Sequence, residues 1–339
     1  MASTYRAPGR VNLIGEHTDY NQGFVLPIAI DLECRVTASP SETWSASSRQ
    51  LGETLPVTPH RRNSWIDYVA GVVQEFGGSP QHLEIDSSVP VGSGLSSSAA
   101  LEVAVALACL GDDSIPPLDL VLRTNKVERE FIGLPCGIMD QYASVFGEEG
   151  KAILLDCRSA TSRTITLPDV SIVVVNSMVK HSLAAGSAYA TRVAECAAAC
   201  GQLGISTLRE AEYSPDLPKR ARHVTGENCR VLDFVESCEA GDVHRMGELL
   251  IASHESLRDD YEVSCDEIDF LVTKSCDFPG VFGARITGGG FGGCILALVD
   301  PGTESAYEAH IAEVYRGNYG IEPETYRCWP SAGAGLMEG

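Results

Sequence analysis

A cluster of chemically varied polar side chains lies near the N-terminus of the sequence, at residues 9–20. Its polar members are Arg10, Asn12, Glu16, His17, Thr18, Asp19 and Tyr20. They alternate with apolar residues that should be buried, and polar groups beside a core are costly unless they are paired or used. Carboxylate, imidazole and guanidinium groups together provide the donors and acceptors that a polyhydroxylated ligand needs. A solvated charged surface is the alternative interpretation.

A second segment, residues 90–100, is rich in glycine and serine and stands between an expected strand and an expected helix. It contains Gly92, Ser93, Gly94, Leu95, Ser96, Ser97 and Ser98. Glycine lets a backbone approach a phosphate closely, and the N–H groups of a helix N-terminus point toward an anion. No Lys-Ser/Thr pair ends the segment, so it is not a Walker A loop. The alternative is a serine-capped helix that follows a turn.

A third segment, residues 288–293, has five glycines in six positions between two apolar runs. A dinucleotide-binding fold would need a helix to begin here and an acidic residue about twenty positions later. Residues 294–299 have the composition of a strand instead, which argues against that fold. A glycine turn is costly in folding entropy, and this one indicates close backbone contact with a ligand or another loop.

The elements that must position these segments follow from hydrophobic periodicity. Strands are expected at residues 24–37, 83–89, 152–155, 172–175, 284–287 and 294–299, and helices at 65–76, 97–110 and 118–132, with helical patterns prevailing from about residue 187 to the third glycine segment. This irregular alternation favours an α+β fold over a doubly wound parallel sheet. A boundary near residue 165 would divide the chain into domains at 1–165 and 166–339.

Composition excludes several classes of function. The chain has 339 residues, and its 46 acidic against 25 basic side chains give a formal net charge of −21. Such an acidic body repels phosphate backbones and anionic lipid, so neither nucleic acid nor a membrane is an expected partner. The 12 cysteines show no Cys-x-x-Cys pair and no zinc spacing. Free thiols and a polar N-terminus predict a cytoplasmic protein.

Residues 7–29, 90–103 and 284–298, in this order, resemble the three motifs of the galactose–homoserine–mevalonate–phosphomevalonate (GHMP) kinase family. The first has the form found in the galactokinase branch, and residues 65–68, 135–141 and 155–159 are also similar to that branch. The chain is shorter than is typical there, and it carries one extra residue between His181 and Tyr189. The resemblance implies a two-domain α+β fold, with a ribosomal-protein-S5-domain-2-like N-terminal half and a ferredoxin-like C-terminal half. The active site would lie in the cleft between the halves.

The resemblance also implies a role for individual residues. Asp140 would be the catalytic carboxylate, with Arg10 stabilising its charge; without the resemblance, Asp140 would be interpreted as a helix N-cap. The expected sugar ligands are Glu16, His17, Thr18, Asp19, Gly137 and Tyr189. The loop from Gly92 to Ser98 would bind the ATP phosphates, and Ser98 and Glu128 would hold Mg²⁺. Trp65 could lie near the adenine, although its place on an apolar helix stripe favours the core.

The implied reaction is transfer of the γ-phosphoryl group of MgATP to the anomeric hydroxyl of D-galactose. The products would be α-D-galactose 1-phosphate and ADP, in the first committed step of galactose catabolism. Two alternatives stay open: a kinase for a related sugar such as N-acetylgalactosamine, and a non-catalytic sugar and ATP sensor on the same fold. A monomer or weak homo-oligomer is expected.

Overall fold

The structure, a computed structural model, describes residues 2–111, 113–180 and 185–337. The segment between His181 and Tyr189, where one extra residue is expected, lies in part outside the described residues. The chain divides into two compact units, each made of separate segments. The first unit contains residues 2–10, 29–149 and 330–337, and the second contains 11–28 and 150–329.

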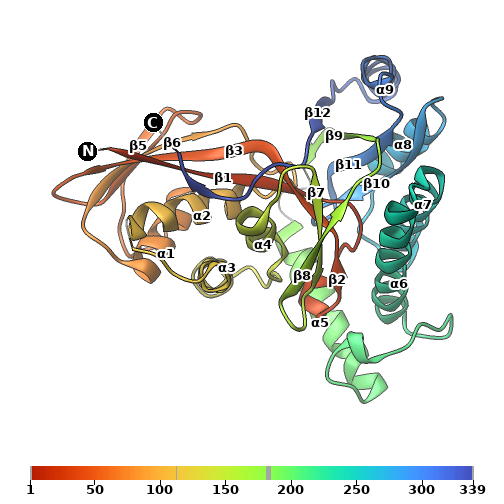
Figure 1. The fold of residues 1–339 in the computed structure, drawn as a ribbon. Helices are drawn as coiled ribbons and strands as arrows, with labels where there is room; N and C mark the ends of the chain where they lie inside the picture. Colours follow the sequence, from red (N-terminus) through yellow and green to blue (C-terminus); the bar gives the residue numbers. More distant parts are fainter. Residues whose placement is uncertain (1, 112, 181–184, 338–339) are drawn as a thin grey trace. The chain divides into compact units, whose positions relative to one another are not determined.

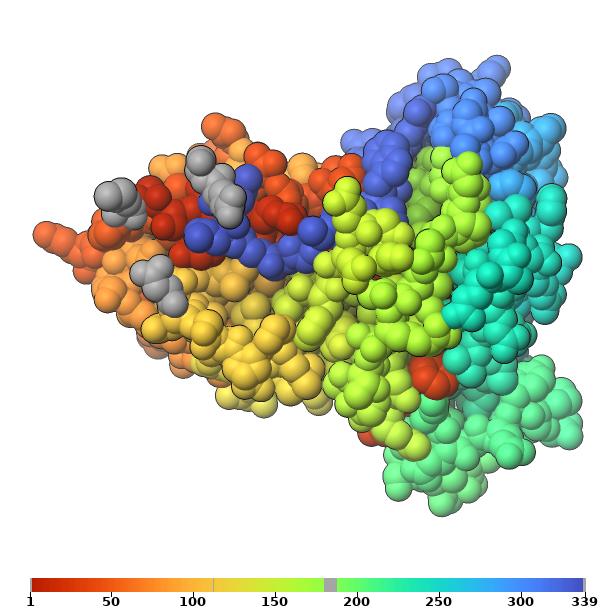
Figure 2. Space-filling view, in the orientation of Figure 1, coloured from red at the N-terminus to blue at the C-terminus, as the bar shows by residue number. Residues whose placement is uncertain are grey.

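This division differs from the expected one at residue 165, because strand pairing joins segments that are far apart in the sequence. β2 (Phe24–Val25) pairs with β7 (Lys151–Asp156), so residues 11–28 belong with the second unit. β13 (Gly335–Leu336) pairs with β1 (Ser3–Asn12), which returns the last residues to the first unit. Figure 2 shows this blue C-terminal segment along the red N-terminal part of the chain.

The first unit is built on a six-stranded sheet in the order β13-β1-β3-β6-β4-β5. The remaining strands are β3 (Pro27–Pro40), β4 (Ser45–Ser48), β5 (Glu53–Pro56) and β6 (Gln81–Ser87). In β3, buried Cys34, Val36 and Ala38 alternate with more exposed residues, as expected of a sheet with one face on a core. α1 and α2 cover the face that carries these buried residues and lie beneath the sheet in Figure 1.

The helices of the first unit carry Asp140 and Glu128, and one of them begins at the end of the Gly-Ser loop, whereas Arg10 lies on β1. They are α1 (Ile66–Phe76), α2 (Ser97–Leu110), α3 (Pro117–Lys126), the π-helical segment η2 (Val127–Ile132) and α4 (Met139–Phe146). α2 is buried on nearly all sides, which explains its run of Ala, Leu and Val. η2 continues α3 with a wider turn, a distortion that is frequent at functional sites.

The second unit has two antiparallel sheets. Its four-stranded sheet has the order β10-β11-β9-β12, and its three-stranded sheet the order β2-β7-β8. The strands not yet given are β8 (Thr161–Thr166), β9 (Ser171–Lys180), β10 (Val281–Thr287), β11 (Gly292–Val299) and β12 (Glu324–Cys328). The third glycine segment is therefore the turn of the β10–β11 hairpin, as expected.

The second unit also contains helices, which pack on both of its sheets and on one another. They are α5 (Ala185–Leu203), α6 (Lys219–Ala240), α7 (Val243–Asp259), α8 (Asp266–Cys276) and α9 (Glu304–Tyr319), with 3₁₀ turns η1 (Asp19–Asn21) and η3 (Leu208–Glu210). α6 and α7 run side by side in Figure 1, and α7 packs on β10. The core joins sheet residues such as Val173 and Ile295 to the buried rings of Tyr261, Tyr307 and Tyr315. No helix among the described residues is long and apolar enough to cross a membrane.

Candidate active site

The Gly-Ser loop ends at the N-terminus of the buried helix α2. Gly92 and Gly94 have φ angles of 73° and 77°, and Ser96, which precedes the helix, has a φ of 61°. A left-handed conformation is strained for a residue with a side chain, and such strain concentrates at functional sites. The first N–H groups of α2 have no partner within the helix, which suits them to bind an anion.

Arg10 and Asp140 form a two-pronged ion pair, although 130 positions separate them in the sequence. Arg10 Nε donates to Asp140 Oδ1 and Nη2 donates to Oδ2, both at 2.7 Å. The Ser96 hydroxyl donates to Oδ2 as well. Since these partners occupy the carboxylate, Asp140 is not the N-cap that its position at the start of α4 suggested. Its side chain is 25% exposed, so it can still reach a ligand.

Arg10 also ties the Gly-Ser loop to the same place. Its Nη1 donates to the carbonyl of Gly94 at 2.5 Å, and its backbone N–H donates to the carbonyl of Leu95 at 3.1 Å. The loop approaches β1 so closely that a Cβ on Gly9 would lie 2.6 Å from the Leu95 oxygen. Glycine at position 9 is therefore required by the geometry of the loop.

Ser98 and Glu128, the expected metal ligands, meet on one side of α2. The Ser98 hydroxyl donates to Glu128 Oε1 at 2.9 Å, and Glu128 is 3% exposed. Burial and the neighbouring charge of Asp140 raise the pKa of Glu128. No cluster of three His, Cys, Asp or Glu side chains able to hold a metal occurs in the described part of the chain. Two protein oxygens fit Mg²⁺, which usually keeps phosphate oxygens and waters as its other ligands.

A second buried carboxylate, that of Glu102, stands behind Glu128. Gln141 Nε2 donates to Glu128 Oε2 at 2.7 Å and to Glu102 Oε2 at 3.1 Å. Glu102 is fully buried, and among the described residues its Oε1 has no hydrogen-bond partner. Burial and the charge of Glu128 raise its pKa well above the ordinary value. Gly137, an expected sugar neighbour, precedes Gln141 by four positions in the sequence. Its carbonyl accepts from Asn125 Nδ2 at 2.6 Å.

A cavity of about 340 Å³ adjoins the Gly-Ser loop. Gly92, Ser97 and Ser98 border it, and Trp65 and Tyr68 form part of its apolar wall. Trp65 is partly exposed, and its Nε1 donates to Glu53 at 3.1 Å. The prediction that Trp65 belongs to the core is therefore wrong, since the residue caps the N-terminus of α1 and borders the cavity.

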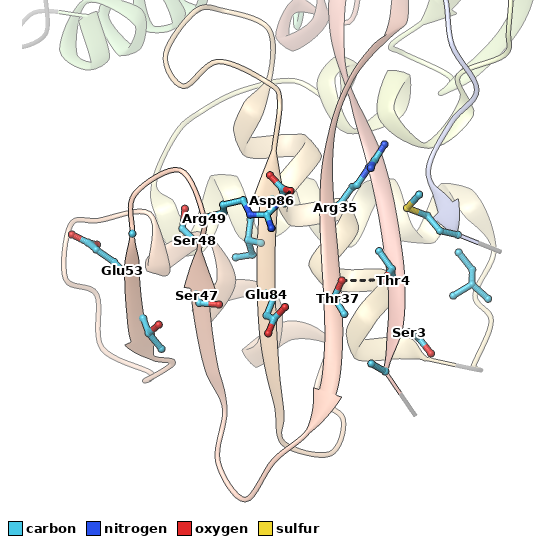
Figure 3. A pocket seen from close by; sticks show the side chains of 16 residues that line it. Ser3, Thr4, Arg35, Thr37, Ser47, Ser48, Arg49, Glu53, Glu84 and Asp86 are labelled. Carbon is cyan, nitrogen blue, oxygen red and sulfur yellow. Dashed lines mark hydrogen bonds and ion pairs between the residues drawn. The ribbon is translucent and has the colours of Figure 1, made fainter. Parts of the chain in front are cut away.

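A larger hollow, of about 820 Å³, lies on the outer face of the six-stranded sheet (Figure 3). Two of its charged side chains form a pair, in which Arg49 donates to Asp86 at 2.7 Å. Thr4 and Thr37 share a hydrogen bond of 2.9 Å across neighbouring strands. None of the expected site residues lines this hollow, so size alone does not locate the chemistry.

In the second unit, Glu16, His17, Thr18 and Asp19 lie in a tight loop between β1 and β2. Thr18 is fully buried, and its hydroxyl contacts the carbonyls of Gly15 at 2.8 Å and Phe24 at 2.6 Å. Thr18 thus closes the loop. Gly15 has a φ of 102°, and a Cβ there would lie 2.7 Å from the Phe24 oxygen.

Helix α6 holds this loop with three polar side chains. His223 Nε2 donates to the carbonyl of Glu16 at 3.1 Å, and Glu227 Oε1 accepts from the N–H of Gly15 at 3.0 Å. Asn228 Oδ1 accepts from the N–H of Phe24 at 2.8 Å. Burial alone would raise the pKa of Glu227, but the charge of Arg230, 2.7 Å away, together with His223, Arg285 and the hydrogen bond from Ser253, outweighs it and brings that pKa to about 2.

His17 is a strained residue of the loop, with a φ of 61°. Its Nδ1 lies 2.8 Å from the hydroxyl of Tyr20, which lies 2.6 Å from that of Tyr261. Burial, and then the proximity of His223, lowers the pKa of His17 to about 3, so the ring is neutral. Its buried Nε2 has no partner among the described residues. The ring of Tyr189 lies 5.6 Å away, which places this expected sugar ligand beside the loop.

The expected residues therefore form two groups. Arg10, the Gly-Ser loop, Glu128, Gly137 and Asp140 belong to the first unit, and Glu16–Asp19 and Tyr189 belong to the second. Sequence reasoning missed the side chains that support them, namely Glu102, Gln141, His223, Glu227 and Arg285. Glu102 and Arg285 carried a signal, since each is a lone charge in an apolar element. The residues of α6 carried none, because they belong to an ordinary polar helix pattern.

Comparison with known proteins agrees with this geometry. The model of the GHMP kinase N-terminal domain matches residues 66–148, and that of the GHMP kinase C-terminal domain matches residues 234–317. The Methanococcus jannaschii mevalonate kinase structure shares the fold, with a TM-score of 0.74 at 17% identity over 98% of this chain and 99% of that one. The fold and the site thus define a small-molecule kinase of the GHMP class.

More specific matches narrow the class. A galactokinase galactose-binding signature matches residues 2–40. A galactokinase of Haemophilus influenzae (strain PittEE) is 41% identical over 364 aligned residues, covering 98% of this chain and 94% of that protein. The structure of Lactococcus lactis galactokinase complexed with galactose matches with a TM-score of 0.92 at 35% identity, over 99% and 95% of the two chains. The chain belongs to the galactokinase family.

Proposed function

We propose that this protein is an ATP-dependent sugar kinase that phosphorylates D-galactose at its anomeric hydroxyl, giving α-D-galactose 1-phosphate and ADP. The 41% identity to a galactokinase over nearly the whole chain supports the reaction. The observation that carries the proposal is the pairing of Arg10 with Asp140 beside the Gly-Ser loop. A chain that had lost the activity and only sensed its ligands would have no need to keep this pair in working geometry.

Asp140 would act on the sugar hydroxyl. Arg10 holds both oxygens of the Asp140 carboxylate and so fixes its direction, which lets it orient a hydroxyl and accept its proton. Ser96 holds the same carboxylate from the Gly-Ser loop. Arg10 would also offset negative charge that develops on the sugar oxygen during transfer.

ATP would bind along the Gly-Ser loop and the N-terminus of α2, where backbone N–H groups suit its phosphates. The cavity beside Trp65 and Tyr68 has an apolar wall suited to the base. Ser98 and Glu128 would hold Mg²⁺, which supplies positive charge to the transferring phosphoryl oxygens. The raised pKa of Glu128 supports this assignment, since a cation would relieve the repulsion between Glu128 and Asp140.

In the second unit, galactose would be recognised by Glu16, His17, Asp19 and Tyr189; the role of Gly137 stays a prediction from the sequence. The unpartnered Nε2 of neutral His17 is suited to a hydroxyl, because burying it without a partner is costly. A substrate contact by Thr18 has no support from its hydrogen bonds, which stay within the loop. The cytoplasmic location and the monomeric or weakly oligomeric state remain predictions from the sequence.

A panel of sugars with MgATP and a coupled ADP readout tests the proposal. We expect galactose-dependent ADP release and a product that has lost its reducing end. Turnover of N-acetylgalactosamine without turnover of galactose would reject the substrate and keep the kinase class. Tight binding of galactose and ATP with no ADP release would identify a sensor instead.

A further inference from the structure

Arg285 places a full positive charge in the interior of the second unit. It belongs to β10, just before the third glycine segment, and its side chain is 0% exposed. Its Nε donates to the carbonyl of Leu13 at 2.7 Å, Nη1 to that of Ile286 at 2.5 Å, and Nη2 to that of Asn12. A buried guanidinium is costly unless its donors are satisfied and a negative charge is near. These contacts fasten β10 to the start of the loop that carries Glu16.

Glu16 supplies the negative charge. Among the described residues it is the one carboxylate within ion-pair distance of Arg285, with Nη2 and Oε1 3.3 Å apart. The same Oε1 accepts from the Thr287 hydroxyl at 3.1 Å and from the backbone N–H of Gly288 at 2.9 Å. Three donors therefore converge on Oε1, whereas no donor in the described part of the chain contacts Oε2. One oxygen of Glu16 is anchored and the other is left available.

The glycines after Thr287 lie close to Tyr189, another expected sugar ligand, and to Val263. A Cβ on Gly289 would lie 3.7 Å from the Tyr189 ring. Gly290 has a φ of 84°, and a Cβ there would meet Val263 at 2.7 Å. The N–H of Phe291 donates to the carbonyl of Val263 at 2.7 Å, which fixes the far end of the turn. The turn is thus held in place where it contacts Glu16 and Tyr189.

We propose that Arg285, Thr287 and the N–H of Gly288 act as a positioning clamp that anchors Glu16 Oε1 and presents Oε2 to the sugar. The third glycine segment then serves recognition of the sugar rather than of the nucleotide. This inference rests on the proposed galactose kinase function. Its consequence is a selective one: weakening the clamp reduces affinity for galactose and leaves affinity for ATP unchanged.

Thr287→Val tests the clamp with the smallest change, because it replaces one hydroxyl by a methyl group of similar size. We expect the dissociation constant for galactose, measured by calorimetry without nucleotide, to rise roughly 5- to 10-fold, because the loss of one hydrogen bond to Glu16 is passed on to the ligand only in part. The KM for galactose should rise in parallel, and the KM for ATP should stay within a factor of two. Thr287→Ser keeps the hydroxyl and should retain affinity for galactose.

Thr225→Val is the matched control. Thr225 is also buried in the second unit, and its hydroxyl donates to the Ala221 carbonyl of its own helix. The Thr225→Val variant should lower the melting temperature about as much as Thr287→Val does, without changing the affinity for galactose. An unchanged galactose affinity in Thr287→Val, or an equal rise in both KM values, would overturn the clamp.

A double-mutant cycle separates a clamp from a merely structural role. In a Glu16→Ala background, Thr287→Val should have no further effect on galactose affinity, since Thr287 acts through Glu16. Additive effects would overturn the proposal. If Glu16→Ala does not fold, the contrast between Thr287→Val and Thr287→Ser still decides. Failure of the proposed function is recognised separately, because the unaltered protein would then not phosphorylate galactose.

Discussion

The two units hold their buried charges in opposite ways. In the first unit, Glu102 and Glu128 share the amide of Gln141, and both have raised pKa values because burial and like charge disfavour ionisation. In the second unit, buried Glu16 and Glu227 each have an arginine within 3.3 Å, and the nearby histidines are neutral. In the described part of the chain no arginine or lysine lies within ion-pair distance of Glu102 or Glu128, whereas Glu16 and Glu227 are each paired with an arginine.

This difference matches the two kinds of ligand that a sugar kinase must bind. A surplus of buried negative charge becomes favourable only when a cation arrives, as it does with MgATP. A neutral sugar brings no charge, so the charges around it must be balanced beforehand, and the groups that face it offer only hydrogen bonds. The predictions below change one site or the other and ask whether each responds as this contrast requires.

The largest effect is expected from Asp140→Asn, which removes the charge opposite Arg10. Turnover should fall by at least about 100-fold, the contribution of a positioned acid–base group. Binding of galactose and of ATP should survive, because the loops that hold them are unchanged. Steady-state kinetics and calorimetry measure both. The exposed Asp119→Asn is the control, and near-normal turnover in Asp140→Asn would show that Asp140 is not the catalytic carboxylate.

Glu128→Gln should raise the Mg²⁺ concentration needed for half-maximal rate by about 10-fold or more, because a neutral amide replaces a charged metal ligand. The fold should be retained, since the substitution removes a buried charge. Glu130→Gln changes an exposed residue of the same segment and serves as the control. If both variants show the same Mg²⁺ dependence as the unaltered protein, then the first unit does not hold the metal at Glu128.

The neutral histidines of the second unit predict acid sensitivity. Burial lowers the pKa of His17 to about 3 and that of His223 to about 4, whereas in the unfolded chain both values lie near 6.5. The unfolded state therefore binds more protons below pH 6.5. The contribution of these two histidines to the free energy of unfolding is complete above that pH and is lost as the pH falls toward 4. The limiting slope for two groups is about 2.7 kcal/mol per pH unit.

Urea denaturation of the full chain between pH 7.5 and 4.5 measures this slope. His223→Gln should roughly halve it, because one titrating group remains. An equal slope in both proteins would mean that the acid sensitivity arises elsewhere.

Glu102→Gln should produce the smallest effect, a gain in stability. A group whose pKa is raised by folding costs stability once the pH exceeds its unfolded value, and this cost grows with pH. The isosteric amide removes the cost and can still accept from Gln141. The free energy of unfolding at pH 8 should rise by on the order of 1 kcal/mol, the usual size of a single-residue effect. A loss of stability, equal at pH 6 and pH 8, would show that Glu102 is ionised and paired.

Patterns of local sequence predicted the elements and the loops of the site well. The apolar run of α2, the Gly-Ser loop before it and the β10–β11 glycine turn all occur where periodicity and turn residues placed them. Local patterns also predicted α1, although Trp65 caps its N-terminus and is partly exposed instead of lying in the core. The resemblance to GHMP kinases supplied the link between Arg10 and Asp140, which spacing alone does not contain.

What could not be predicted is the support behind the site, because it depends on long-range packing. The clamp on Glu16 joins residues about 270 positions apart, and the hold of α6 on Gly15 spans 212. The short strands β4, β5 and β13 also escaped prediction, since segments this short carry too little periodic pattern. The discontinuous units follow from the same cause, as residues 330–337 return to pair with β1.

The return of β13 to β1 has a consequence for how the protein is made. A ribosome releases the chain from its N-terminus, and early domains usually fold while synthesis continues. Here the first unit cannot complete its six-stranded sheet until the final residues have emerged, about 180 residues after its main segment ends. During that interval β1 presents an unpaired edge, which is a hazard for aggregation. Nascent chains that stop before residue 330 are therefore the ones that we expect to need protection by a chaperone.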